Sequence, residues 1–191
     1  MKKIHYAVLY TSFLLFANAL SANETKFAEL NNQKFGDMKK MTIASNTTSA
    51  PKTIFFDAGG KELTLNDFKG RLTLVNFWAT WCAPCRKEMP SLEELSNQIG
   101  GDTFQVLTIA TMRSSEEAVK KFFNDNNIID LPKFRDPKGY LARASGVAAL
   151  PLTILLDRNG NEISRLIGDA DWVQDETIEF IKKAIEIDKL N

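Results

Sequence analysis

The chain has 191 residues, of which 44% are hydrophobic, so it is long enough for one domain with an ample core. Its 24 lysines and arginines balance 24 aspartates and glutamates, which gives a formal net charge of zero. This balance, with no basic stripe along the chain, argues against a nucleic-acid-binding protein.

The first 22 residues are typical of a targeting segment. Lys2 and Lys3 precede the apolar run 4–20, and Ala17-Asn18-Ala19 matches a signal-peptidase pattern. The pattern predicts export to the periplasm or to the outer face of the inner membrane. Because the apolar run, about 17 residues, is just long enough to span a bilayer, residues 1–22 are either a cleaved signal peptide or an N-terminal membrane anchor.

Histidine is missing from the chain beyond this segment, since the only one is His5. Loss of residues 1–22 therefore excludes Ser-His-Asp and Cys-His hydrolases and imidazole metal sites. Residues 23–50 are polar with little periodicity, and we expect them to form a linker. A single domain is then expected over residues 51–191.

From residue 51 onward, the hydrophobic pattern alternates between strands and helices. Two short strands at 52–57 and 61–65 predict a β-hairpin. A near-continuous apolar run at 72–77 predicts a buried central strand. Further strands are expected at 103–110, 131–135, 152–157 and 161–167. Helices are expected over 84–98, from Ser114 to about 126, over 136–145 and over 175–189. The first helix should kink at Pro90, and Ser114 and Asp136 should cap the second and third.

This order of elements predicts an α/β fold. A strand–helix–strand crossover, followed by a hairpin and a final helix, gives one central mixed β-sheet flanked by helices on both faces. The hairpin at 52–65 is expected to add to this sheet as an N-terminal β-hairpin.

The chain's two cysteines, Cys82 and Cys85, lie where the strand at 72–77 passes into the helix that begins near Pro84. Two thiols in Cys-x-x-Cys spacing at a helix start can close and reopen a small disulfide. The unpaired N–H groups of that helix start stabilise a thiolate. The pattern predicts a redox pair in which Cys82 is the nucleophile and Cys85, one turn further on, resolves the mixed disulfide.

Two other interpretations of the cysteine pair are weaker. A zinc site needs four ligands, and the chain offers no second cysteine pair and only His5. A structural disulfide across a two-residue loop would constrain the unfolded chain very little.

Three stretches carry a family signature. They are the run from Val75 to Pro90, which contains Trp81-Cys82-Ala83-Pro84-Cys85, the pair Gly146-Val147, and Leu150-Pro151-Leu152-Thr153. In these stretches the chain resembles the thioredoxin superfamily, and closely its exported TlpA/ResA/DsbE branch. The segments 136–139 and 168–172 resemble the TlpA subgroup in particular. The resemblance covers residues from about 51 to the C-terminus.

The resemblance implies a thioredoxin fold and a substrate groove. Pro151 matches a proline that is cis in this fold and that shapes the groove for an extended segment of the partner. Leu150, Trp81 and Pro84 would line the same groove.

The resemblance also implies a route for protons. Glu88 matches a glutamate that handles protons at the site of ResA-like proteins, and its spacing of three residues places it on the helix face of Cys85. Asn76 stands where cytoplasmic thioredoxins carry a buried aspartate. Because an amide cannot accept that proton, Glu88 or water must substitute for it.

The function implied is that of an exported thiol:disulfide oxidoreductase that needs no cofactor and acts as a monomeric reductant. Its electrons would come from a membrane thiol transporter of the DsbD/CcdA type. Its substrates would be cysteine pairs in cytochrome oxidase copper-site assembly or the haem-binding cysteines of apocytochrome c.

Two alternatives stay open from the sequence. A DsbA-like oxidant or isomerase usually carries histidine between its cysteines, where this chain has Ala83 and Pro84. A Sco-like copper chaperone needs a further histidine, which the chain lacks beyond His5.

Overall fold

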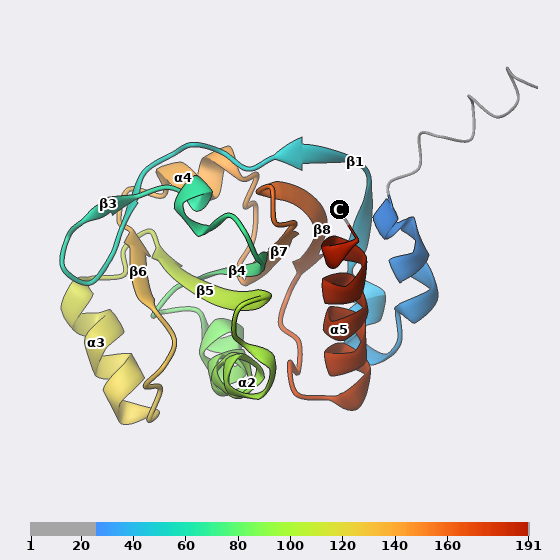
Figure 1. Ribbon diagram of the computed structural model, residues 1–191. Helices are drawn as coiled ribbons and strands as arrows, with labels where there is room; N and C mark the ends of the chain where they lie inside the picture. The colour runs from blue at the N-terminus through green and yellow to red at the C-terminus, as the bar shows by residue number, and fades with distance from the viewer. Residues whose placement is uncertain (1–25, 191) are drawn as a thin grey trace, which may run out of the picture.

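The computed structural model describes residues 26–190 (Figure 1). The predicted leader at 1–22 lies outside the described residues. Over 26–190, none of the helices combines the length and the apolar character that a bilayer span requires.

The described chain forms one eight-stranded sheet with the strand order β1-β8-β7-β4-β5-β6-β2-β3. Helices cover both of its faces, as the sequence predicts for an α/β fold (Figure 1). The strands are β1 (Thr42–Ser49), β2 (Phe55–Phe56), β3 (Glu62–Leu63), β4 (Leu72–Trp78), β5 (Phe104–Thr111), β6 (Lys133–Asp136), β7 (Leu152–Leu156) and β8 (Asn161–Ile167). The helices are α2 (Ala83–Ile99), α3 (Glu116–Asp125), α4 (Tyr140–Ala144) and α5 (Asp175–Lys189), with 3₁₀ helices η1 (Lys26–Gln33), η2 (Gly36–Lys40) and η3 (Leu65–Phe68).

Strand β4 is the centre of the sheet. It pairs in parallel with β5 and antiparallel with β7, and all of its residues are buried. Successive side chains of a strand point to opposite faces. Leu74 and Trp78 therefore belong to the core on the α2 and α5 side, whereas Val75 and Phe77 belong to the core on the α4 side. This two-sided burial explains the near-continuous apolar run in the sequence.

The expectation that residues 23–50 form a polar linker is wrong for the described part of that segment. Phe27, Leu30, Met38 and Met41 are at most 1% exposed and belong to the same core as α5. Strand β1 pairs antiparallel with β8 and forms one edge of the sheet. The folded domain therefore includes residues 26–50, and we call this part of the chain the N-terminal extension.

The sequence hides this extension for two physical reasons. Three of its four core side chains are spread over two short 3₁₀ helices, whose period differs from that of the α-helix, and the fourth, Met41, follows the second of them. Strand β1 buries none of its side chains fully, so it lacks an apolar face. Its place in the sheet depends on backbone pairing with β8, which composition does not reveal.

The opposite edge of the sheet is the predicted hairpin, with strands shorter than expected. β2 pairs antiparallel with β3 and also with β6.

Two helix caps also differ from the prediction. Ser115, not Ser114, caps α3, and α4 begins at Tyr140 although the Asp136 carboxylate still accepts hydrogen bonds from the Tyr140 and Ala142 N–H groups.

Candidate functional site

The cysteine pair lies where β4 passes into α2. Cys82 is the N-cap of α2, and its Sγ accepts a hydrogen bond of 3.3 Å from the Cys85 N–H. The two cysteines are joined by a disulfide with their Cα atoms 5.3 Å apart. Cys82 is 6% exposed and Cys85 is fully buried. Of the two sulfur atoms, that of Cys82 is therefore the one that a partner can reach.

The start of α2 favours a thiolate at Cys82. The unpaired N–H groups of a helix start carry partial positive charge and lower the pKa of a thiol placed there. The first turn of α2 contains no acidic residue that would oppose this effect.

The residues predicted to line a groove lie around the same end of the sheet. Trp81 is 53% exposed, and the Arg113 guanidinium lies 6.0 Å from the centroid of its ring. Pro84 is exposed on the first turn of α2. Because Phe77 pairs with Leu152, Pro151 lies level with the carboxyl end of β4. The peptide bond between Leu150 and Pro151 is cis.

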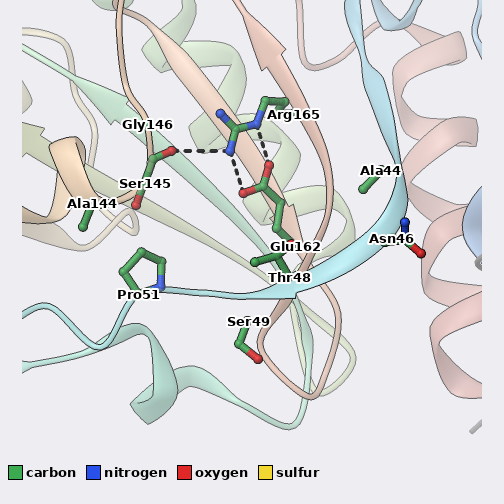
Figure 2. Close-up of a pocket in the computed structure, with 10 residues that line it drawn as sticks. All are labelled: Ala44, Asn46, Thr48, Ser49, Pro51, Ala144, Ser145, Gly146, Glu162 and Arg165. Atoms are coloured by element: carbon green, nitrogen blue, oxygen red, sulfur yellow. Dashed lines mark hydrogen bonds and ion pairs between the residues drawn. The ribbon is translucent and has the colours of Figure 1, made fainter.

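An ion pair supports the segment that leads to Pro151. A pocket of about 320 Å³ lies between β1, β8 and the end of α4 (Figure 2). Across it, the Arg165 guanidinium donates to both Glu162 carboxylate oxygens, at 2.6 and 2.8 Å, and to the Ser145 carbonyl at 3.4 Å. Ser145 ends α4 and precedes the segment 146–150. Strand β8 thus anchors the chain five residues before Leu150 and Pro151, which the sequence predicts as groove residues.

Glu88 is buried one turn after Cys85. Its side chain is 3% exposed and accepts three hydrogen bonds. Asn76 Nδ2 of β4 donates to Oε1 at 2.9 Å. The Ala170 N–H and Trp172 Nε1 donate to Oε2 at 3.1 and 3.0 Å. The carboxyl group thus joins α2, β4 and the loop 168–174.

This environment moves the titration of Glu88 toward neutral pH. Burial raises the pKa of Glu88 from 4.5 to about 7, although the hydrogen bonds from Trp172, Asn76 and Ala170 act in the opposite direction. The nearby Asp169 carboxylate also raises this pKa. A group with a pKa near the working pH is well suited to accept and return a proton.

Sequence reasoning missed two partners of Glu88. Trp172 is fully buried and donates to the carboxyl group, and no periodicity in 168–172 indicates that contact. Asn76 was expected only as a residue that cannot accept a proton. The structure shows that it is a hydrogen-bond donor to Glu88.

Burial of Glu88 predicts a stability that falls as the pH rises. Between its ordinary pKa of 4.5 and its folded pKa of about 7, the folded state binds more protons than the unfolded state. The free energy of unfolding therefore decreases through this range, by up to about 3 kcal/mol. Glu88→Gln removes this titration, so we expect urea unfolding of the oxidised variant to show a smaller difference between pH 5 and pH 8.

The matched control for this experiment is Glu94→Gln on the same helix. Glu94 is exposed, and its carboxylate accepts a hydrogen bond from Gln98. Its variant is expected to keep the slope of the wild type. Equal slopes for Glu88→Gln and the wild type would contradict the assigned pKa of Glu88.

Over 26–190, no three side chains of Cys, His, Asp or Glu converge as metal ligands would.

Comparison with known proteins places these features in a wider group. Residues 44–178 match the Redoxin family. Thiol-disulfide oxidoreductase ResA of Bacillus cereus is 33% identical over 149 residues, which cover 78% of this chain and 82% of ResA. Thioredoxin-like protein YneN of Bacillus subtilis is 35% identical over 122 residues, which cover 64% of this chain and 71% of YneN.

Solved structures confirm the predicted thioredoxin fold. A thiol:disulfide interchange protein DsbE from Chlorobium tepidum has a TM-score of 0.64 at 26% identity, over 73% of this chain and 96% of its own. A secreted thiol-disulfide isomerase from Corynebacterium glutamicum has the same TM-score of 0.64 at 23% identity, over 81% of this chain and 95% of its own, a likeness that shows the fold alone.

Proposed function

The chain belongs to the redoxin family, in its TlpA/ResA/DsbE-like branch of thiol:disulfide oxidoreductases, and from this premise we propose that it is an exported reductant of protein cysteine pairs. The proposed substrates are cysteine pairs in copper-site assembly of cytochrome oxidase or in cytochrome c maturation. The proposed electron donor is a membrane thiol transporter of the DsbD/CcdA type, and the protein acts as a monomer.

The proposed reaction begins at Cys82. The reduced Cys82 thiolate attacks one sulfur of a substrate disulfide, so the substrate S–S bond breaks and a mixed disulfide forms. The Cys85 thiolate then attacks Cys82 Sγ. The second substrate thiolate leaves, the Cys82–Cys85 disulfide forms, and two electrons have passed to the substrate. The released thiolates take up protons to give the reduced substrate.

Glu88 serves the second step in this scheme. It follows Cys85 by three residues on α2, a spacing that places both side chains on one face of the helix. With its raised pKa, the carboxylate takes the proton of the Cys85 thiol and returns it to solvent or to the leaving substrate thiolate.

The single observation that carries the reducing direction is the burial of this carboxyl group beside the pair. A strong oxidant of this fold owes its potential to stabilisation of its reduced, thiolate form. While it is ionised, a buried carboxylate on the face of Cys85 opposes a thiolate there through like-charge repulsion, so Cys85 gains its negative charge only as Glu88 takes up the proton. The reduced form of this pair is therefore less stable than in an oxidant, which favours giving electrons away.

Docking of the substrate uses the rim around Cys82. In this proposal the exposed ring of Trp81, Pro84 and the half-buried Leu150 line the approach to the attacking Cys82 sulfur, and Pro151 lies at the end of β4. An extended segment of the substrate that carries its cysteine is the ligand that suits such a rim.

The potential of the Cys82–Cys85 couple tests the proposed direction. It is measured by equilibrating the protein with defined ratios of reduced and oxidised dithiothreitol or glutathione at pH 7. We expect a value near the roughly −270 mV of thioredoxin. A value near the roughly −120 mV of DsbA would assign the protein as an oxidant and overturn the proposal.

A further inference from the structure

Helix η2 of the N-terminal extension carries an ion pair that contacts the loop 168–174. Lys40 Nζ lies 2.8 Å from Asp37 Oδ1. The other Asp37 oxygen accepts a hydrogen bond of 2.9 Å from the Asp171 N–H, and Lys40 Nζ donates to the Asp169 carbonyl at 2.9 Å. We call the side chains of Asp37 and Lys40 the clasp, because together they bind the loop on both sides of Ala170.

The loop held by the clasp supplies two of the hydrogen bonds to Glu88. They come from the Ala170 N–H, which lies between the two clasped residues, and from Trp172 Nε1, one residue beyond them. The Trp172 N–H is fixed in turn by Ser91 Oγ of α2 at 3.2 Å. A chain of direct contacts thus leads from η2, through the loop, to the carboxyl group that neighbours Cys85.

The clasp stays formed at the pH values where Glu88 titrates. Lys40, through its hydrogen bond, and the Asp171 N–H lower the pKa of Asp37 below its ordinary value of 3.8. Asp37 therefore remains ionised when Glu88 gains or loses its proton. Met38, between the clasp residues, is fully buried and holds η2 against the core.

We propose that Asp37 and Lys40 are positioning residues, which hold the loop 168–174 so that Ala170 and Trp172 keep donating to Glu88. This inference rests on the proposed function, in which Glu88 exchanges a proton with Cys85. Both donors stabilise the ionised carboxylate. Without the clasp, the loop relaxes away from α2, and Glu88 retains its proton to a higher pH.

The charged groups around Glu88 come from three elements. Its own helix contributes Lys87, the loop contributes Asp169 and Asp171, and η2 contributes the clasp. Cys85 on the same helix is uncharged in the disulfide. Strands β4 and β7 contribute only the neutral side chains of Asn76 and Thr153, which are hydrogen-bonded to one another. A pocket of about 450 Å³ between η2, α2 and the loop connects this region with solvent.

The test removes both clasp residues together, as Asp37→Ala with Lys40→Met. Because one acid and one base are lost, the net charge near Glu88 is preserved, and a change in its titration reports the position of the loop. The control is Lys121→Met with Asp125→Ala, which removes an exposed pair of the same kind, 2.8 Å apart, on α3. Asp37→Asn with Lys40→Gln keeps neutral hydrogen-bonding groups and is expected to restore most of the wild-type behaviour.

Two readouts are used on the full chain. The first is the ¹³C NMR titration of the Glu88 side-chain carboxyl in the oxidised protein, assigned with Glu88→Gln. The second is the pH of the inflection in the midpoint potential of the cysteine couple. We expect the clasp variant to move both to higher pH by about half a unit or more, and the α3 control to move neither.

The outcomes separate the inference from the proposed function. An unchanged NMR titration in a folded clasp variant overturns the inference. A shifted NMR titration in the clasp variant supports the positioning role. If, in addition, Glu88→Gln leaves the pH profile of the midpoint potential unchanged, the role of Glu88 in proton exchange is overturned while the positioning role stands. If the clasp variant does not fold, Trp172→Phe is used instead. This change removes the Trp172 Nε1 donor to Glu88, so it should also raise the pH at which Glu88 titrates. An unchanged Glu88 titration in Trp172→Phe also overturns the inference.

Discussion

Replacing Cys85 with serine is expected to stop turnover and to leave the protein covalently joined to its substrate through Cys82. Cys82 is the cysteine whose sulfur a partner can reach, whereas Cys85 is fully buried behind it. With Cys85 removed, the first attack still forms the mixed disulfide, but no internal thiolate remains to resolve it. Reduction of substrate should fall to the uncatalysed background while the adduct accumulates.

The measurement is mass spectrometry of the reduced variant after mixing with an oxidised peptide that contains a Cys-x-x-Cys-His segment, without added thiols. The matched control is Cys82→Ser, which is expected to be equally inactive and to form no adduct. Both variants lose the Cys82–Cys85 disulfide, so a loss of stability common to them cannot produce the difference. Adducts on Cys82→Ser alone would reverse the assigned roles.

Replacing Leu30 with alanine is expected to destabilise the whole domain. Leu30 is fully buried in η1 and belongs to the core that includes α5. Its truncation leaves a cavity, and buried leucine-to-alanine changes cost about 2–5 kcal/mol. Urea unfolding of the oxidised protein, followed by tryptophan fluorescence, should show this loss as a lower midpoint in a single transition.

Phe35→Ala is the control for this measurement. Phe35 lies between η1 and η2 in the same extension but is 56% exposed, so its truncation should change the free energy of unfolding by no more than about 0.5 kcal/mol. If Leu30→Ala were equally silent, residues 26–50 would be a linker after all. The pair of variants thus tests the largest difference between the sequence-based expectation and the structure.

Local chemistry made the redox pair predictable. The spacing of Cys82 and Cys85, the apolar run before them and the helical period after them are all properties of neighbouring residues. Hydrophobic burial and helix geometry convert such patterns directly into a strand, a turn and a helix. The same short-range patterns predicted the central strand, the order of the helices and the burial of Cys85 behind Cys82.

Contacts between distant segments were decided by the tertiary structure alone. Trp172 Nε1 reaches Glu88 across 84 positions of the chain, and Asp37 reaches the Asp171 N–H across 134. No local period encodes such pairs, because hydrogen bonds between loops depend on where the sheet and helices place each backbone.

The sequence by itself thus determined where the redox disulfide lies, since Cys82, Cys85 and the helix start are adjacent. Only the tertiary structure decided how Glu88 is buried and which groups donate hydrogen bonds to its carboxyl group. It also decided that the N-terminal extension packs against the loop that supplies two of these donors. The physical reason is that desolvation is a property of the assembled core. A carboxyl group on an isolated helix is solvated, and its pKa rises only when β4, α2 and the loop 168–174 close around it.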